Sequence, residues 1–191
     1  MGRFSSQWEM WWPGFLLFWP SFKPRLPDRL NTLRSLGHFK LNVDASVAVS
    51  AGVVGLGLAI RDDLGRMKDA GSVGITASLD PSLAEAMAVL HSIRLAIDSG
   101  FSPILVESDA LDMINIMQDG VIPSSDLGLI VLDIFQFCLC SSVISFSFVP
   151  RTTNKVANAL AKGTVSFGSD CFWYNVCPPF VEILVQEDSP G

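Results

Sequence analysis

The order of apolar and polar positions predicts a group of antiparallel strands in the first half of the chain. Apolar and polar residues alternate over His38–Val49, and a second strand-like segment, Val53–Ile60, follows a turn of small residues. Alternation with period two places successive side chains on opposite faces of a sheet. The polar segment Arg61–Gly65 ends in glycine, which predicts a hairpin turn into a third strand over about residues 66–76. Three antiparallel strands therefore open the folded region.

Helical periodicity replaces the alternation after residue 80. Asp80 fits an N-cap, and Pro81 fits the first helical position, where its missing N–H costs nothing. The helix is expected to run to about Ser99 and to end at Gly100, with a broad apolar face. Glu85 lies among small residues on this helix. It is either a carboxylate aimed at a crowded neighbour or a solvated helix acid, and periodicity does not separate these two interpretations.

The second half of the chain alternates strands and helices. The predicted elements are the strand Phe101–Val106, a helix starting near Asp109, the apolar helix Asp126–Cys140, the strand Val143–Val149 and a last helix from about Asn154. A strand, helix, strand order implies parallel strands joined by a crossover. The whole order, β-β-β-α-β-α-α-β-α, predicts an α/β fold with a mixed sheet. Asp109 lies just beyond the end of a parallel strand, where functional groups gather in such sheets. Without other evidence, however, its position at the start of a helix favours a role as N-cap.

The composition indicates one globular domain with extensions. The 191 residues are 49% apolar and 17% charged, enough to bury a core of ordinary size. The net charge of −6 argues against tight non-specific binding to nucleic acid, because release of counterions from phosphates drives such binding. The acidic charge is compatible with a contact to nucleic acid that is bridged by a metal ion. The cysteines have neither zinc-site spacing nor the density of a disulfide framework, so we expect reduced thiols and a nuclear or cytoplasmic protein. They are Cys138, Cys140, Cys171 and Cys177.

The chain divides by composition into three parts. Residues 1–37 form an aromatic-rich leader and a basic linker that we expect to be disordered, residues 38–167 the folded domain, and residues 168–191 a C-terminal tail. The uninterrupted apolar stretch Gly14–Trp19 is far shorter than the ~20 residues that span a membrane. The leader also lacks a clear signal-peptide cleavage site. Residues 1–6 fit the loose N-myristoylation pattern, which many chains match by chance. We therefore predict no transmembrane segment, and we prefer a disordered leader to a lipidated one.

Three acidic residues stand on three separate predicted elements. Asp44 lies on the first strand, Glu85 on the first long helix, and Asp109 just beyond a short strand. Carboxylates are the hard oxygen ligands that Mg²⁺ requires. The three residues therefore predict a divalent metal site.

Four segments, taken in this order, carry a resemblance to a known family. They are Leu41–Ser46, Leu83–Ala86, Val106–Ala110 and Val149–Ala161. Each segment is weak alone, but their order and their places on the predicted elements resemble the ribonuclease H domain of plant non-LTR retroelements and their genomic relatives. The resemblance covers about residues 38–167, and residues 173–180 look like the usual ending of that group.

The resemblance implies a ribonuclease H-like fold, with a five-stranded mixed sheet flanked by helices, and Mg²⁺-dependent endonucleolytic cleavage of the RNA strand of an RNA–DNA hybrid. Mn²⁺ would substitute for Mg²⁺, and two ions roughly 3.5–4 Å apart would activate a water and stabilise the leaving oxygen. Asp44 would bridge both ions, Glu85 and Asp109 would supply the remaining ligands, and Asn158 would complete the catalytic set. The expected partner is hybrid nucleic acid, bound by a monomer. Residues expected at the substrate are Ala45, Ser46, Arg151, Asn154 and Lys155.

The chain departs from the family pattern in three places. Asn158 stands where the family carries a fourth acid, and the loss of one negative charge predicts weaker metal binding. The loop Pro150–Thr153 has no histidine, so Arg151 would touch phosphate there, with Lys155 and Lys162 either assisting or simply solvated. Ala45 replaces a glycine and would crowd a closely approaching substrate. Two hypotheses follow: an active but weakened nuclease, or a catalytically silent domain that binds nucleic acid or protein.

Overall fold

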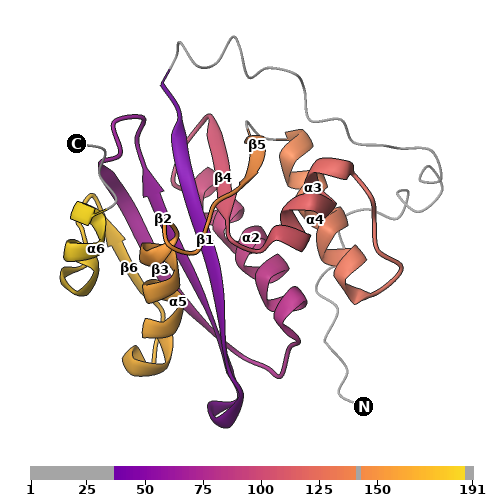
Figure 1. Cartoon of the computed structure of the whole chain (residues 1–191), viewed down its shortest axis with the longest axis horizontal. Coiled ribbons are helices and arrows are strands. Elements are labelled where there is room, and N and C mark those ends of the chain that lie inside the picture. The colour runs from indigo at the N-terminus through magenta and orange to yellow at the C-terminus, as the bar shows by residue number, and fades with distance from the viewer. Residues whose placement is uncertain (1–36, 141–142, 188–191) are drawn as a thin grey trace.

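The strands form one mixed sheet in the computed structural model, which describes residues 37–140 and 143–187 (Figure 1). The strand order is β5-β4-β1-β2-β3-β6; β1, β2, β3 and β6 pair antiparallel in turn, whereas β1 with β4 and β4 with β5 pair parallel. The predicted α/β fold is confirmed, with one strand more than the five expected. The strands are β1 (Phe39–Ala48), β2 (Val53–Arg61), β3 (Met67–Thr76), β4 (Ile104–Ser108), β5 (Val143–Phe148) and β6 (Cys171–Tyr174).

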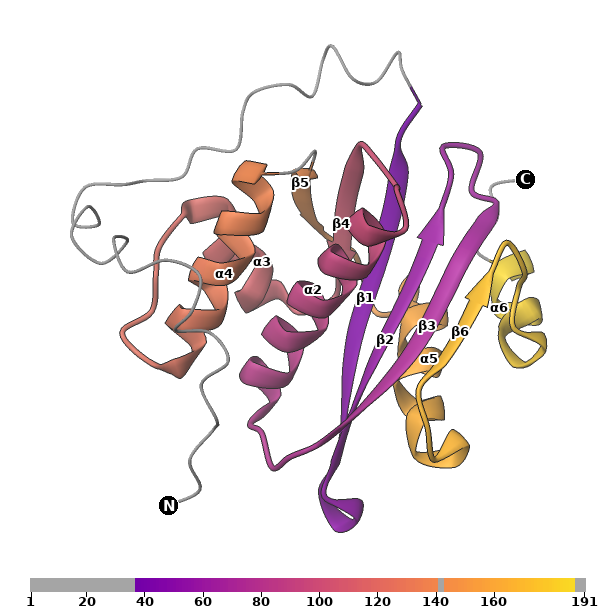
Figure 2. The ribbon, with the colours of Figure 1, turned by 180° about the vertical axis from the view of Figure 1, so that it is seen from behind.

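Helices cover both faces of the sheet (Figure 1 and Figure 2). On one face α5 packs across β1, β2 and β3; on the other α2 packs against β1 and β2 and is flanked by α4. The helices are α2 (Pro81–Asp98), α3 (Leu111–Asp119), α4 (Asp126–Cys140), α5 (Lys155–Phe167) and α6 (Glu182–Glu187), with short 3-10 turns η2 (Val49–Ala51) and η3 (Pro179–Val181).

Local signals in the sequence account for the bounds of α2. The Asp80 carboxylate accepts hydrogen bonds from the backbone N–H groups of Ser82 at 3.0 Å and Leu83 at 3.2 Å, as expected of an N-cap. Ser99 caps the other end, and Gly100 follows with a φ of 82°, a value that glycine adopts readily. The predicted helix is therefore confirmed to within one residue.

The segment between α2 and α3 differs from the prediction. β4 starts at Ile104 rather than at Phe101, because Pro103 has no N–H to donate to the sheet. The N-cap residue of α3 is Ala110, and no side chain caps this helix. The N-cap interpretation of Asp109 is therefore wrong.

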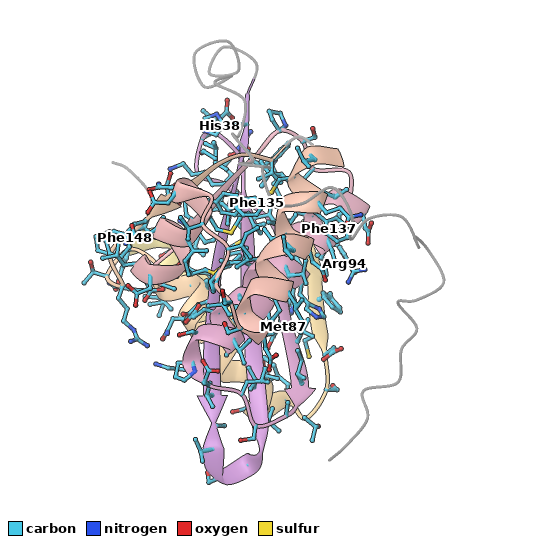
Figure 3. The ribbon with its side chains drawn as sticks, turned by 90° about the vertical axis from the view of Figure 1, so that its right-hand side faces the viewer. His38, Met87, Arg94, Phe135, Phe137 and Phe148 are labelled. Atoms are coloured by element: carbon cyan, nitrogen blue, oxygen red, sulfur yellow. The ribbon has the colours of Figure 1, made fainter. Side chains whose placement is uncertain are left out.

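The main core lies between the sheet and the helices α2, α3 and α4. Phe135 of α4 is fully buried there with Ile93 of α2. Figure 3 looks onto this side of the molecule, where the guanidinium of Arg94 lies over the ring of Phe137, 4.9 Å from its centroid. This contact links α2 to α4, and α2 is the helix that carries Glu85.

Two glycines of β2 let α5 approach the sheet closely. A Cβ atom at Gly57 would lie 2.1 Å from the carbonyl oxygen of Ala157, and one at Gly55 would lie 2.0 Å from that of Ala161. No side chain fits these gaps, so the glycines serve packing. The close approach brings Asn158 of α5 over the strand β1, which neighbours β2.

The C-terminal segment adds to the sheet. β6 pairs with β3, and Trp173 packs against Phe167 and Phe180 with ring centroids 5.8 Å away in both contacts. The predicted disordered leader lies outside the described residues. Within the described ranges, no helix is both long and apolar enough to cross a membrane, and Cys138, Cys171 and Cys177 are free thiols.

Candidate functional site

Two of the three predicted acids meet where β1 and β4 lie side by side. The parallel register pairs Val43 of β1 with Ser108 at the end of β4. Asp44 and Asp109 each follow one residue later, so they emerge at the same edge of the parallel pair. Asp44 is only 2% exposed, and the negative charge of Asp109 acts on it. The sheet topology therefore brings together two residues that are far apart in the sequence.

Glu85 reaches the same cluster from α2. It is flanked by Ala84 and Ala86, both fully buried. Its Oε2 atom is buried and has no hydrogen-bond partner among the described residues. Of the two interpretations of Glu85, the structure supports the carboxylate aimed into a crowded environment, not the solvated helix acid.

The surroundings disfavour negative charge on two of these acids. Burial, and then the charges of Asp44 and Asp109, raise the pKa of Glu85 from 4.5 to about 8. Burial, and then the charge of Asp109, raise the pKa of Asp44 from 3.8 to about 6. The Ala45 backbone N–H and the Arg151 charge lower both pKa values without cancelling the rise. Acids held at such pKa values are typical of functional sites.

Two asparagines of the α5 region donate to the acids. The Asn158 Nδ2 atom donates a short hydrogen bond to Asp44 Oδ2. The Asn154 Nδ2 atom donates to Asp109 Oδ1 at 2.7 Å and to the carbonyl oxygen of Val43 at 2.9 Å. Asn154 is 1% exposed and so ties the start of α5 to β1 and to Asp109. Asn154, a residue expected at the substrate, lies in this structure as a buried clamp between β1 and Asp109, a role that the sequence does not signal.

The chemistry of the cluster suits a divalent cation. Three carboxylates supply hard oxygen ligands, and a nearby cation would favour the charged forms of Asp44 and Glu85, which their surroundings otherwise disfavour. Across the described residues, however, no three acidic, histidine or cysteine side chains converge closely enough to hold a metal ion as they are placed. In these side-chain positions, Asp109 accepts a hydrogen bond from the Asn154 amide, and Asp44 accepts one from the Asn158 amide. Side-chain rotation is therefore needed for the three to share one ion.

The predicted substrate residues lie in different surroundings. Arg151 is 70% exposed, and its Nε atom lies 3.9 Å from Asp109 Oδ2, at the cluster. Lys155 pairs with Glu187 of α6 at 2.9 Å, and Lys162 is exposed on α5. Ala45 and Ser46 are half-buried on β1, directly after Asp44.

A recess of about 290 Å³ adjoins Glu85 between the first turn of α2 and the helices α3 and α4. The sequence did not predict it, because its walls come from three helices. Its lining residues are Pro81, Ser82, Glu85, Ala110, Leu111, Asp112, Met113, Ile116 and Leu127.

The mixed sheet, the helices on both faces and the acids at the β1–β4 edge define a ribonuclease H-like domain. The chain belongs to the reverse transcriptase-like family, whose model matches residues 42–164. This range contains Asp44, Glu85, Asp109 and Asn158. The resemblance to ribonuclease H is thus confirmed at the level of the domain, whereas a plant and non-LTR origin stays a prediction. A search of curated proteins gave no match.

Solved structures of ribonucleases H share the fold. RNase H1 from the halophilic archaeon Halobacterium salinarum is 21% identical, with a TM-score of 0.61 over 69% of this chain and 98% of that one. LC11-RNase H1, solved in complex with an RNA/DNA hybrid, is 18% identical, with a TM-score of 0.62 over 68% and 98%. The N-terminal RNase H domain of rv2228c from Mycobacterium tuberculosis is 18% identical, with a TM-score of 0.58 over 65% and 96%. At these identities the likeness concerns the fold.

Proposed function

We propose that this domain is a metal-dependent endonuclease that cleaves the RNA strand of RNA–DNA hybrids. The observation that carries the proposal is the meeting of Asp44, Glu85 and Asp109 from β1, α2 and the end of β4. Families that share a fold need not share a function, so the fold supports the proposal only together with this site. One of the similar structures contains an RNA/DNA hybrid, which makes the hybrid the first substrate to test.

The three carboxylates would hold Mg²⁺ or Mn²⁺, and we propose a site for two ions. Bound there, the metal would supply a Lewis acid for the phosphate and lower the pKa of the attacking water. The three acids act on one another, since the charges of Asp44 and Asp109 both raise the pKa of Glu85 and the charge of Asp109 raises that of Asp44. We propose Asp44 as the ligand shared between the ions because the family resemblance implies this role for it.

The remaining residues of the site would position the substrate. Arg151, exposed beside Asp109, would contact a backbone phosphate and so favour the approach of nucleic acid to an acidic protein. Ala45 and Ser46 lie next to Asp44 on β1, within the same edge of the sheet, and we propose them as contacts to the cleaved strand. Lys155 is the weaker candidate because Glu187 already pairs with it.

A silent domain that only binds hybrid or protein is the second candidate. The Asn158 hydrogen bond favours it, because Asp44 already has an internal donor where a fourth acid would share a cation. The residue ranges of the domain and its flanks, the monomeric state, the retroelement origin and the cellular compartment stay predictions under either candidate.

Cleavage of an end-labelled RNA–DNA hybrid in Mg²⁺ and in Mn²⁺ tests the proposal. Single-stranded RNA and duplex DNA serve as substrate controls, and Asp44→Asn and Asn158→Asp are compared with the native chain. We expect the native protein and Asn158→Asp to cut the RNA strand of the hybrid and Asp44→Asn to be inactive. Folded native and Asn158→Asp proteins that both leave the hybrid intact would refute the nuclease and direct attention to binding.

A further inference from the structure

The backbone of α5 holds Asn158 in a fixed place above Asp44. Gly57 pairs with Asp44 across β1 and β2, and the carbonyl of Ala157 lies directly over Gly57. Because the helix already approaches the sheet as closely as a glycine allows, it has no freedom to move nearer. The distance between the backbones of Asn158 and Asp44 is therefore set by the packing of α5, and only side chains can change position.

The two asparagines at the cluster differ in how firmly they are held. Asn154 is almost fully buried, and its Nδ2 atom binds Val43 O as well as Asp109. Asn158 is half-buried, and its Nδ2 atom donates to Asp44 alone among the described residues. Rotation of the Asn158 side chain therefore breaks one hydrogen bond, whereas rotation of Asn154 breaks two and uncovers a buried backbone carbonyl.

An amide N–H and a metal cation compete for the same carboxylate oxygen. Both satisfy negative charge on Asp44, but the amide nitrogen has no lone pair free for a cation and its hydrogens repel one. In the orientation observed, Asn158 thus opposes a cation at Asp44 Oδ2. This differs from a merely missing charge, because a residue with no donor at position 158 would not compete.

We propose that Asn158 is a built-in competitor of the divalent cation: its amide closes the acid cluster in the metal-free protein and must rotate away before Asp44 can bind metal. The inference rests on the proposed metal site and adds the part that Asn158 plays in it. It predicts that removal of the amide tightens metal binding. If Asn158 were instead a ligand through its oxygen, removal would weaken binding, so the two roles differ in sign.

Direct measurement of Mn²⁺ affinity separates these roles without relying on catalysis. Free Mn²⁺ is quantified by electron paramagnetic resonance during titration of the full chain and of Asn158→Ala, Asn158→Leu and Asn158→Asp. In the Ala and Leu variants, Mn²⁺ no longer has to displace the hydrogen bond from the Asn158 amide to Asp44. Because a hydrogen bond to a charged group is strong, we expect these variants to bind Mn²⁺ about tenfold more tightly than the native chain. The Asp variant should bind tighter still, because it also adds a carboxylate.

The matched control is Asn42→Ala, because Asn42 donates an equivalent amide hydrogen bond, 2.9 Å long, to Glu107 outside the acid cluster. It should leave the Mn²⁺ affinity within about twofold, a change of less than 0.5 kcal/mol. Circular dichroism and thermal unfolding verify that each variant is folded. Asn158→Leu, close to asparagine in size, guards against misfolding of Asn158→Ala.

Each outcome has a definite meaning. Tighter binding by both Asn158→Ala and Asn158→Leu supports competition. Unchanged or weaker binding in these variants overturns it while leaving the metal site intact, provided that the native chain or Asn158→Asp binds Mn²⁺. Absence of Mn²⁺ binding by all folded variants, Asn158→Asp included, overturns the metal site and the competition together.

Discussion

Replacement of Glu85 by glutamine should stabilise the metal-free protein while it removes a proposed ligand. The half-buried Glu85, whose buried Oε2 atom has no hydrogen-bond partner among the described residues, has a pKa raised from 4.5 to about 8, chiefly by burial and then by the charges of Asp44 and Asp109. Glutamine has nearly the same shape and no charge, so it escapes this penalty. A site prepared for a cation is expected to strain the protein when the cation is absent.

The pKa values give the size and the pH dependence of the gain. At about 1.4 kcal/mol per pKa unit, a rise from 4.5 to about 8 corresponds to roughly 5 kcal/mol. Solvent and relaxation of the neighbouring acids reduce this, so about 2–3 kcal/mol is expected at pH 8.5. Because the folded state holds the proton more tightly, the native chain loses this stability as the pH rises from about 4.5 to about 8. The advantage of Glu85→Gln should therefore be near zero below pH 4.5 and complete above pH 8.

Urea unfolding in EDTA at several pH values between 5 and 8.5 measures the difference directly. Glu182→Gln, an exposed glutamate in the first turn of α6, is the matched control and should change the unfolding free energy by less than about 0.5 kcal/mol at every pH. A Glu85→Gln protein that is no more stable than the native chain at pH 8.5 would refute the view that the surroundings of Glu85 disfavour its negative charge.

Three further predictions concern the packing and the ligands of the site. Gly57→Ala should destabilise the domain by about 3 kcal/mol in urea unfolding, since its Cβ would overlap the Ala157 carbonyl. Gly52→Ala is the control, because its Cβ meets no atom within 4 Å. A smaller loss of unfolding free energy in Gly57→Ala than in Gly52→Ala would contradict this prediction. Asn154→Ala should cost about 2–3 kcal/mol by the same assay, because Val43 O and Asp109 lose their shared donor, and a loss below 0.5 kcal/mol would be inconsistent with a clamp. Mg²⁺ at 100 times its Kd should stabilise the native chain by about 2.7 kcal/mol in thermal unfolding, and an equal shift in Asp44→Asn would place the ion elsewhere.

Local signals made much of the fold predictable. The Asp80 cap, Pro81 and Gly100 fix α2 through short-range chemistry, and the Arg61–Gly65 turn fixes the hairpin, in which the Asp62 Oδ1 atom accepts from the Arg66 backbone N–H at 2.9 Å. The strand β6 was not predicted, because its pairing with β3 depends on the packing of residues distant in sequence.

The predicted sheet topology was enough to bring acidic site residues together, but it was not enough to predict their hydrogen-bond partners. A parallel β1–β4 pair suffices to bring Asp44 and Asp109 to one edge. The Asn158–Asp44 and Asn154–Asp109 hydrogen bonds join residues 114 and 45 positions apart, and each depends on the depth at which α5 sits on the sheet. That depth is set by Gly55 and Gly57, whose role becomes specific only once the helix is placed against them.

Anomalous diffraction from crystals of the full chain grown with Mn²⁺ tests the central claim most directly, namely that Asp44, Glu85 and Asp109 jointly hold a divalent cation. We predict that the anomalous peak locates a Mn²⁺ ion bound by carboxylate oxygens of all three residues. The Asn158 amide nitrogen should then no longer donate a hydrogen bond to Asp44. The account would be contradicted if crystals grown with saturating Mn²⁺ showed no anomalous peak at these carboxylates. A peak from an ion that binds neither Asp44 nor Glu85 would contradict it as well.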